Sequence, residues 1–222
     1  MAQQTDPRIL GTEPIGKLLL QYSIPAIIGM TITSLYNIID SIFIGHGVGP
    51  LAISGLAITF PVMNLTFALV LLVGIGGASI CSIRLGQQDI DGATRVLGNV
   101  LLLGLINGVT FGLLSQLVLD PVLTAFGASE HTLPYARDFM LYGLPVTCTM
   151  FGLNHVMRAT GYPQKAMLSA VLTVGMNVIL APIFIFWLEW GIRGAAVATV
   201  LSQCVGMVWV LSHFRNPNST VH

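Results

Sequence analysis

One carboxylate stands inside a long apolar stretch of the chain. Asp40 follows an uncharged run at residues 18–39 and precedes the glycine-rich segment 45–50. Aspartate at the centre of a membrane-spanning helix costs about 2.5 to 3.5 kcal/mol on insertion scales, so such residues normally face a bundle interior or a water-filled cavity. Asp40 is therefore predicted to be functional. The alternative is an aspartate at the membrane interface that merely ends the first span.

Three polar side chains share the predicted helix face of Asp40. Thr33, Tyr36 and Asn37 precede it by seven, four and three positions, and these spacings put all four residues on one side of an α-helix. Their hydroxyl, amide and carboxylate oxygens can bind a proton, a sodium ion or a cationic solute. Burial favours the protonated carboxyl over the bare anion. The stripe is a candidate proton or cation site.

Two prolines lie inside predicted helical stretches. Pro25 can kink the first stretch and Pro182 the fifth, and each frees a backbone carbonyl that can serve a hinge or an ion site. Asn177 lies five residues before Pro182, so its amide is expected near the freed backbone. Tolerated kinks without a function are the alternative for both prolines.

Composition indicates the elements that must position these residues. Of 222 residues, 54% are hydrophobic and 8% are charged, against about 25% charged in an ordinary soluble domain. This balance excludes a soluble globular protein and identifies the lipid bilayer as a partner. Nine Lys and Arg offset nine Asp and Glu, which leaves no basic surface for nucleic acid.

Six uncharged runs are long enough to cross a bilayer as helices. They cover residues 18–39, continuing past Asp40 to about residue 44, then 51–83, 96–119, 139–157, 166–188 and 194–214. Predicted breaks separate them at residues 45–50, 86–92, 120–121, 161–163 and around 191. Because the runs are continuously apolar rather than alternating, they predict helices and not barrel strands. The predicted fold class is all-α and polytopic, with six transmembrane helices.

Small residues indicate how the helices pack. Glycines recur every four residues at Gly104, Gly108 and Gly112, and a second ridge comprises Gly194, Ala198, Ser202 and Gly206. Small side chains let helix backbones approach each other in lipid. Both ridges are predicted to face other helices.

The positions of lysine and arginine predict how the chain is oriented in the membrane. With the N-terminus in the cytoplasm, seven of these residues fall on the inner side and two, Arg137 and Arg193, on the outer side. We therefore expect a multi-pass protein of the cell (inner) membrane with both termini cytoplasmic. The expected organisation is a cytoplasmic tail at 1–14, a six-helix lobe at 15–214 and a cytoplasmic tail at 215–222. The first run is too long for a signal peptide core, so it is expected to stay in the protein.

Catalytic and metal chemistry finds little support in the sequence. The three cysteines lie far apart in apolar stretches, and the five histidines lie in loops or near span ends, so no metal, haem or other cofactor is expected. Ser54 and Ser79 lack a histidine partner at membrane depth, which argues against an intramembrane protease. The expected class is a transporter, not an enzyme.

Several motifs resemble the multidrug and toxic compound extrusion (MATE) transporters. Tyr36-Asn37-Ile38-Ile39-Asp40-Ser41-Ile42-Phe43-Ile44-Gly45 resembles the end of the family's first helix, and Leu51-Ala52-Ile53-Ser54-Gly55-Leu56 the entry to its second. Arg158-Ala159-Thr160-Gly161-Tyr162-Pro163, Met176-Asn177-Val178-Ile179-Leu180-Ala181-Pro182 and Gly191-Ile192-Arg193-Gly194-Ala195-Ala196-Val197-Ala198-Thr199 continue the likeness in order. It covers essentially the whole chain.

The resemblance implies an antiporter that exports organic, often cationic, compounds in exchange for protons or sodium ions. Asp40 corresponds to the family's first-helix acid, Asn177 to its fifth-helix polar position and Pro25 to its first-helix kink. Family members commonly carry an acid directly before the fifth-helix proline, whereas this chain has Ala181. Asp40 would then act with Asn177 and neutral oxygens alone.

The family's members have twelve helices in two lobes, and this chain resembles the first lobe. Its tail at 215–222 resembles the start of the link between lobes. A truncated frame, a partner for a separate second lobe and a half that self-associates all remain open. Two other functions also remain open. One is an inactive lobe that assembles with or regulates another membrane protein, and the other is a lipid-linked oligosaccharide flippase, whose cavity would be expected to carry more cationic residues.

Overall fold

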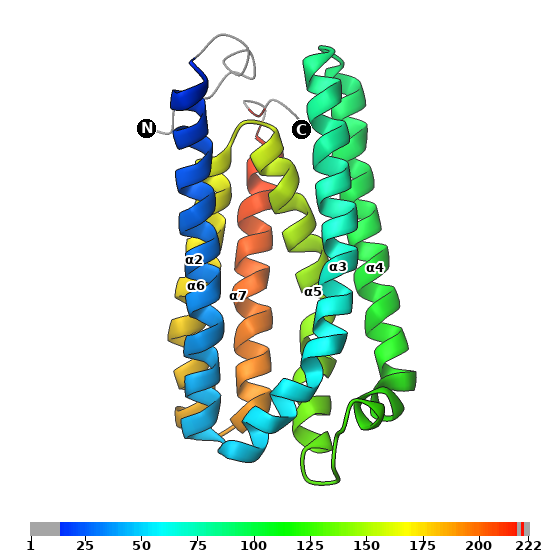
Figure 1. Cartoon of the computed structure of the whole chain (residues 1–222), viewed down its shortest axis with the longest axis vertical. Coiled ribbons are helices and arrows are strands. Elements are labelled where there is room, and N and C mark those ends of the chain that lie inside the picture. Colours follow the sequence, from blue (N-terminus) through cyan, green and yellow to red (C-terminus); the bar gives the residue numbers. More distant parts are fainter. Residues whose placement is uncertain (1–13, 217–218, 220–222) are drawn as a thin grey trace.

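The computed structural model describes residues 14–216 and Ser219, and within them the chain forms a bundle of six long helices (Figure 1). The helices are α2 (Ile15–Gly47), α3 (Pro50–Gly86), α4 (Ile90–Ala125), α5 (Leu133–Ala159), α6 (Pro163–Pro182) and α7 (Gly191–Phe214). A short π-helix, η1 (Ile183–Trp187), extends α6. The predicted all-α polytopic fold is confirmed. The predicted tails at 1–14 and 215–222 fall largely outside the described residues and stay predictions.

Five of the described helical segments are long and apolar enough to cross a membrane. They are α2, α3, α4 as far as Leu114, α6 continued through η1 to Trp187, and α7. The sixth long helix, α5, is not among them and packs against α3, α4 and α7 in the middle of the bundle (Figure 1). A helix surrounded by other helices has less need of an apolar surface than one facing lipid.

Helix ends follow the predicted breaks in most places. Gly49 and Gly161 adopt positive φ angles of 111° and 93° at the turns before Pro50 and Pro163, each of which begins a helix. Glycine has no Cβ, so this backbone conformation carries no steric penalty. At the start of α4, the Asp89 carboxylate accepts a hydrogen bond of 2.8 Å from the Gly92 amide, which caps the helix.

The predicted break at residues 120–121 is wrong. α4 continues through Pro121 to Ala125 and ends at Phe126, before Gly127 with φ 98°. Proline so close to a helix end removes one backbone hydrogen bond without stopping the helix. The carboxylate of Asp120 also pairs with Arg137 of α5 at 3.3 Å, which ties this end of α4 to its neighbour.

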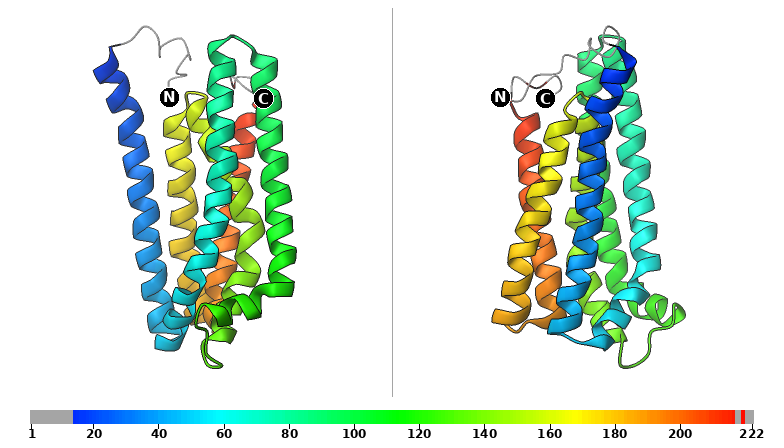
Figure 2. Two further views of the ribbon diagram at one scale, coloured as in Figure 1. Left: turned by 45° about the vertical axis from the view of Figure 1, so that its right-hand side comes forward. Right: turned by 60° about the vertical axis from the view of Figure 1, so that its left-hand side comes forward.

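Helix packing divides the bundle into two flanks. α3 and α4 run side by side on one flank (Figure 2), and α2, α6 and α7 form the other, with α2 packing mainly on α6. The ridge of Gly194, Ala198, Ser202 and Gly206 is buried, and Gly104 and Gly108 are buried on α4, as predicted. α2 begins and α7 ends at the same end of the bundle, here called the terminal end (Figure 1).

Apolar side chains concentrate toward the two ends of the bundle. One cluster near the terminal end includes Leu97, Met157 and Phe214. A second cluster near the opposite end includes Ile44, Ile185 and Ile192. Polar residues of α2, α5, α6 and α7 line a cavity inside the bundle.

Candidate functional site

Asp40 is buried in the half of α2 that lies away from the terminal end. Its side chain is 6% exposed, and its Oδ1 atom has no hydrogen-bond partner among the described residues. A buried polar atom without a partner is unfavourable unless something binds it. The carboxyl therefore has an open position for a proton or a cation.

A hydrogen-bond network joins three helices next to this carboxyl. The Tyr36 hydroxyl, one turn before Asp40 on α2, shares a hydrogen bond of 3.0 Å with the Thr199 hydroxyl of α7. The Asn177 amide of α6 donates to the same Thr199 oxygen at 3.2 Å. Asn177 is 2% exposed, so the structure brings it beside the α2 stripe through Thr199.

The other two predicted stripe residues have different surroundings. Thr33 lines a cavity and donates a hydrogen bond of 2.8 Å to the Gly29 carbonyl of its own helix. Asn37 is exposed, and its amide donates to the Thr33 carbonyl at 2.9 Å. The inward face of α2 thus carries Thr33, Tyr36 and Asp40, while Asn37 lies outside the group.

Prolines lie within two of the helices that supply the polar groups. Pro25 lies buried within α2, which continues through it. Pro182 ends the α-helical part of α6, and the chain then winds as η1, closed by a hydrogen bond of 3.0 Å from the Leu188 amide to the Ile183 carbonyl. π-helical turns occur frequently at functional sites.

Ala181 lies fully buried in the apolar cluster away from the terminal end. Ile44, Ala195 and Ala198 belong to the same cluster. Its methyl group leaves no carboxylate here to pair with Asp40. In the described part of this site, Asp40 is the single acid.

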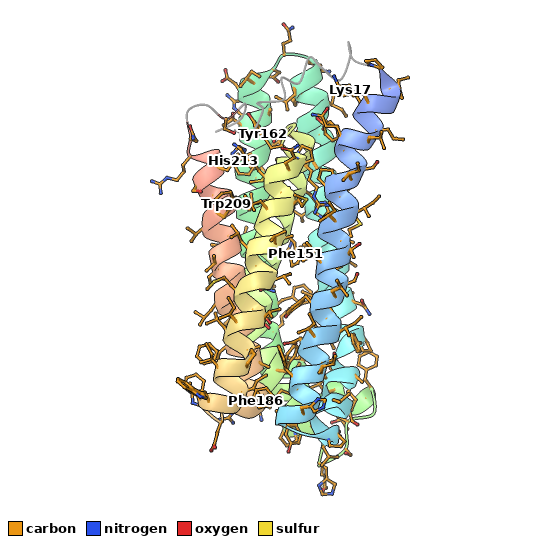
Figure 3. The ribbon with its side chains drawn as sticks, turned by 90° about the vertical axis from the view of Figure 1, so that its left-hand side faces the viewer. Lys17, Phe151, Tyr162, Phe186, Trp209 and His213 are labelled. Carbon is orange, nitrogen blue, oxygen red and sulfur yellow. The ribbon has the colours of Figure 1, made fainter. Side chains whose placement is uncertain are left out.

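A narrow cavity of about 80 Å³ runs between α2, α5, α6 and α7. Its lining comprises Thr33, Tyr36, Met150, Phe151, Asn154, His155, Arg158, Ala170, Thr173, Val174, Asn177, Thr199, Ser202 and Gln203. Figure 3 shows Phe151 about halfway along the bundle, between α2 and α6. Ligand pockets for drug-sized molecules measure about 300 to 1,000 Å³, so this cavity suits an ion or one chemical group of a larger solute.

Sequence reasoning assigned Thr33, Tyr36 and Asn177 to the site but not the other residues of this cavity, of which Thr199 and Arg158 matter most. Thr199 was part of a motif but not of the candidate site, because its partners Tyr36 and Asn177 lie on other helices. Arg158 was likewise predicted only as the first residue of the motif at residues 158–163. In the structure Arg158 is partly buried in the last turn of α5 and lines the cavity. The Asn154 amide of α5 donates a hydrogen bond to the Ser169 hydroxyl of α6.

The comparisons with known proteins agree on one kind of membrane protein. The family model described as MatE matches residues 25–183. The multidrug export protein MepA of Staphylococcus haemolyticus is 29% identical over 210 residues, covering 93% of this chain and 46% of that protein. The chain spans about half the length of the curated relatives it matches.

Among solved structures, too, the chain matches about half of each similar protein. The MATE multidrug transporter DinF-BH is 36% identical with a TM-score of 0.90, and the match covers 96% of this chain and 49% of that one. A MOP superfamily transporter from Pyrococcus furiosus is 31% identical with a TM-score of 0.90, covering 98% and 48%.

Proposed function

The chain belongs to the MatE family of multidrug and toxic compound extrusion proteins, and on that premise we propose that it forms the N-terminal lobe of an ion-coupled antiporter that exports organic compounds. One observation carries the coupling role. Asp40 is buried with an oxygen that has no partner among the described residues, beside the Tyr36–Thr199–Asn177 network. Such a group gains or loses a proton or a cation at low structural cost, because its open position needs no other bond to break.

The arrangement favours a proton over sodium as the coupling ion. Sodium binding needs several oxygen ligands around the cation, and carboxylates supply the strongest of these. Ala181 provides none, and the Thr199 hydroxyl is already engaged by two neighbours. A proton needs only the free Asp40 oxygen.

Transport proceeds by alternating access in this proposal. Protonation of Asp40 removes a buried charge and changes how α2 packs, with Pro25 and Pro182 as the hinge positions. Coupling requires that the proton and the exported solute favour different conformations. Because α2 packs mainly on α6, its movement would change the α2–α6 interface most.

The lobe functions in the plasma membrane with both termini in the cytoplasm. Asp120, Arg137, Asp138 and Arg193 then form ion pairs at the outer surface, where α4, α5 and α7 meet. The solute path lies between this lobe and a second one, supplied by another chain segment or by a second copy. Relatives about twice the length of this chain support that expectation.

The test is export of a fluorescent organic cation by everted vesicles that contain this chain, with proton and sodium gradients imposed separately. Export driven by the proton gradient alone is the expected result. Export driven only by sodium would overturn the assignment of the ion. No gradient-driven export by the inserted, folded chain would overturn the proposal that a second copy can supply the other lobe.

A further inference from the structure

Arg158 brings to the cavity a cation that is unpaired among the described residues. It is partly buried on α5, and its guanidinium lies against Gly29 of α2, where an added Cβ would be 3.7 Å from Nη2. The ion pairs found in the described part of the chain use Arg84, Arg137 and Arg193 instead. A partly buried charge without a counterion is unfavourable, so an anion would stabilise it.

Asp40 is too far away to be that counterion. Arg158 contacts α2 at Gly29, which precedes Asp40 by 11 residues, or roughly 16 Å along a helix at 1.5 Å per residue. Ion pairs form at 4 Å or less. Among the described residues, the lining of the cavity contains Arg158 and His155 and no carboxylate.

Neighbouring side chains on α5 complete a shaped subsite. Phe151, His155 and Arg158 follow the i, i+4, i+7 spacing, so they lie on one helix face over roughly 10 Å. The Phe151 ring packs edge-on against Phe67 of α3, with centroids 5.7 Å apart, which fixes its orientation. His155 lies against Gly74 of α3, where an added Cβ would be 3.1 Å from the imidazole.

We propose that Arg158 and His155 form a subsite for an oxyanion, carboxylate or phosphate, carried on an aromatic solute whose ring contacts Phe151. Arginine presents planar paired donors that match both oxyanions, and imidazole adds a further donor. The cavity volume of about 80 Å³ suits such a group rather than a whole drug. That the natural ligand is an exported solute rests on the proposed function. The solutes would then include zwitterions and anions, besides organic cations.

Binding by the purified chain in detergent tests the subsite without any transport. Benzoate and phenyl phosphate are the aromatic oxyanions, methyl benzoate is the uncharged match, and acetate and inorganic phosphate are the free anions. We expect the aromatic oxyanions to bind and raise the unfolding temperature, and methyl benzoate to do neither. Preference for acetate and inorganic phosphate over the aromatic anions would overturn the aromatic part, and equal binding of benzoate and methyl benzoate would overturn the subsite.

Variants locate the binding. Arg158→Gln is expected to weaken benzoate binding by about tenfold or more, since a hydrogen bond to a charged group is lost. The benzoate affinity of Arg158→Lys should lie between those of the wild type and Arg158→Gln, because lysine keeps the charge but lacks the paired donors. The control Arg95→Gln removes an exposed cation of α4 and should leave the affinity for benzoate unchanged. Unchanged affinity in Arg158→Gln would contradict the proposal, and if that variant does not fold, the lysine variant and the wild-type benzoate comparison decide.

The same assay separates this inference from the coupling role. Asp40→Asn should still bind benzoate, because Asp40 lies outside the subsite. Intact benzoate binding without any export would contradict the proposed function alone. Export without benzoate selectivity would contradict the subsite alone.

Discussion

The hydroxyl groups of Tyr36 and Thr199 lie 3.0 Å apart although 163 residues separate them in the chain. This contact ties α2, which carries Asp40, to α7. The Asn177 amide reaches the same Thr199 oxygen from α6 at 3.2 Å. One threonine therefore joins α2, α6 and α7 beside Asp40, the proposed coupling acid.

Loss of the Thr199 hydroxyl should loosen this junction. Thr199→Val keeps the shape of the side chain but leaves the polar groups of Tyr36 and Asn177 without their shared partner. We expect a loss of about 1 to 3 kcal/mol in the free energy of unfolding, measured with denaturant in detergent. Thr173→Val is the matched control, since the Thr173 hydroxyl lines the same cavity but donates only to the Ser169 carbonyl of its own helix.

A double-mutant cycle tests whether the contact itself is responsible. Tyr36→Phe combined with Thr199→Val should cost less than the sum of the two single changes, with an interaction energy of about 0.5 kcal/mol or more. Strict additivity would show that the two hydroxyls contribute independently and would contradict the junction.

Close helix packing gives a second prediction. A Cβ added at Gly194 of α7 would lie 2.7 Å from the Phe184 carbonyl oxygen of η1, which is backbone and cannot move aside easily. Gly194→Ala should therefore destabilise the fold by about 1 to 3 kcal/mol. Gly175→Ala on α6 meets no described atom within 4 Å and should be neutral or stabilising by up to about 1 kcal/mol. Thermal unfolding of both variants in detergent checks this contrast. Equal shifts in unfolding temperature would contradict the close packing of Gly194 against Phe184.

Membrane orientation gives a third prediction. In a background where Cys81, Cys148 and Cys204 are alanine, an impermeant maleimide should label His131→Cys on intact cells. It should label Gln88→Cys only after permeabilisation, because these exposed turn residues lie at opposite ends of the bundle. The reverse labelling would place both termini outside the cell.

Most of the helices could be predicted because they contain apolar runs long enough to cross a bilayer. Their ends extend a turn or so beyond the uncharged runs, since Pro50 and Pro163 can begin helices that charge positions alone do not reveal. The break expected at residues 120–121 failed because a proline near a helix end is tolerated, and the Asp120–Arg137 ion pair needs the partner helix to be known.

The site was predictable only where it follows one helix. Helical spacing puts Thr33, Tyr36 and Asp40 on one face of the helix, and in the structure Thr33 and Tyr36 line the cavity while Asp40 is buried. The same spacing does not define the edge of that face, so Asn37 was included although it is exposed. Thr199 and Arg158 belong to the site through contacts between helices, which the spacing along one helix does not reveal.

The most direct test of the account is gradient-driven export by the Asp40→Asn variant in everted vesicles. The asparagine amide keeps the size of the side chain but does not gain or lose a proton at physiological pH. Asp120→Asn is the control, since it removes a half-exposed carboxylate near the same end of the bundle, outside the network. Vesicle content and gel-filtration profile confirm that each variant inserts and folds. The account predicts that Asp40→Asn loses proton-driven export while Asp120→Asn keeps it. Proton-driven export at the wild-type rate in Asp40→Asn would contradict the assignment of Asp40 as the coupling acid.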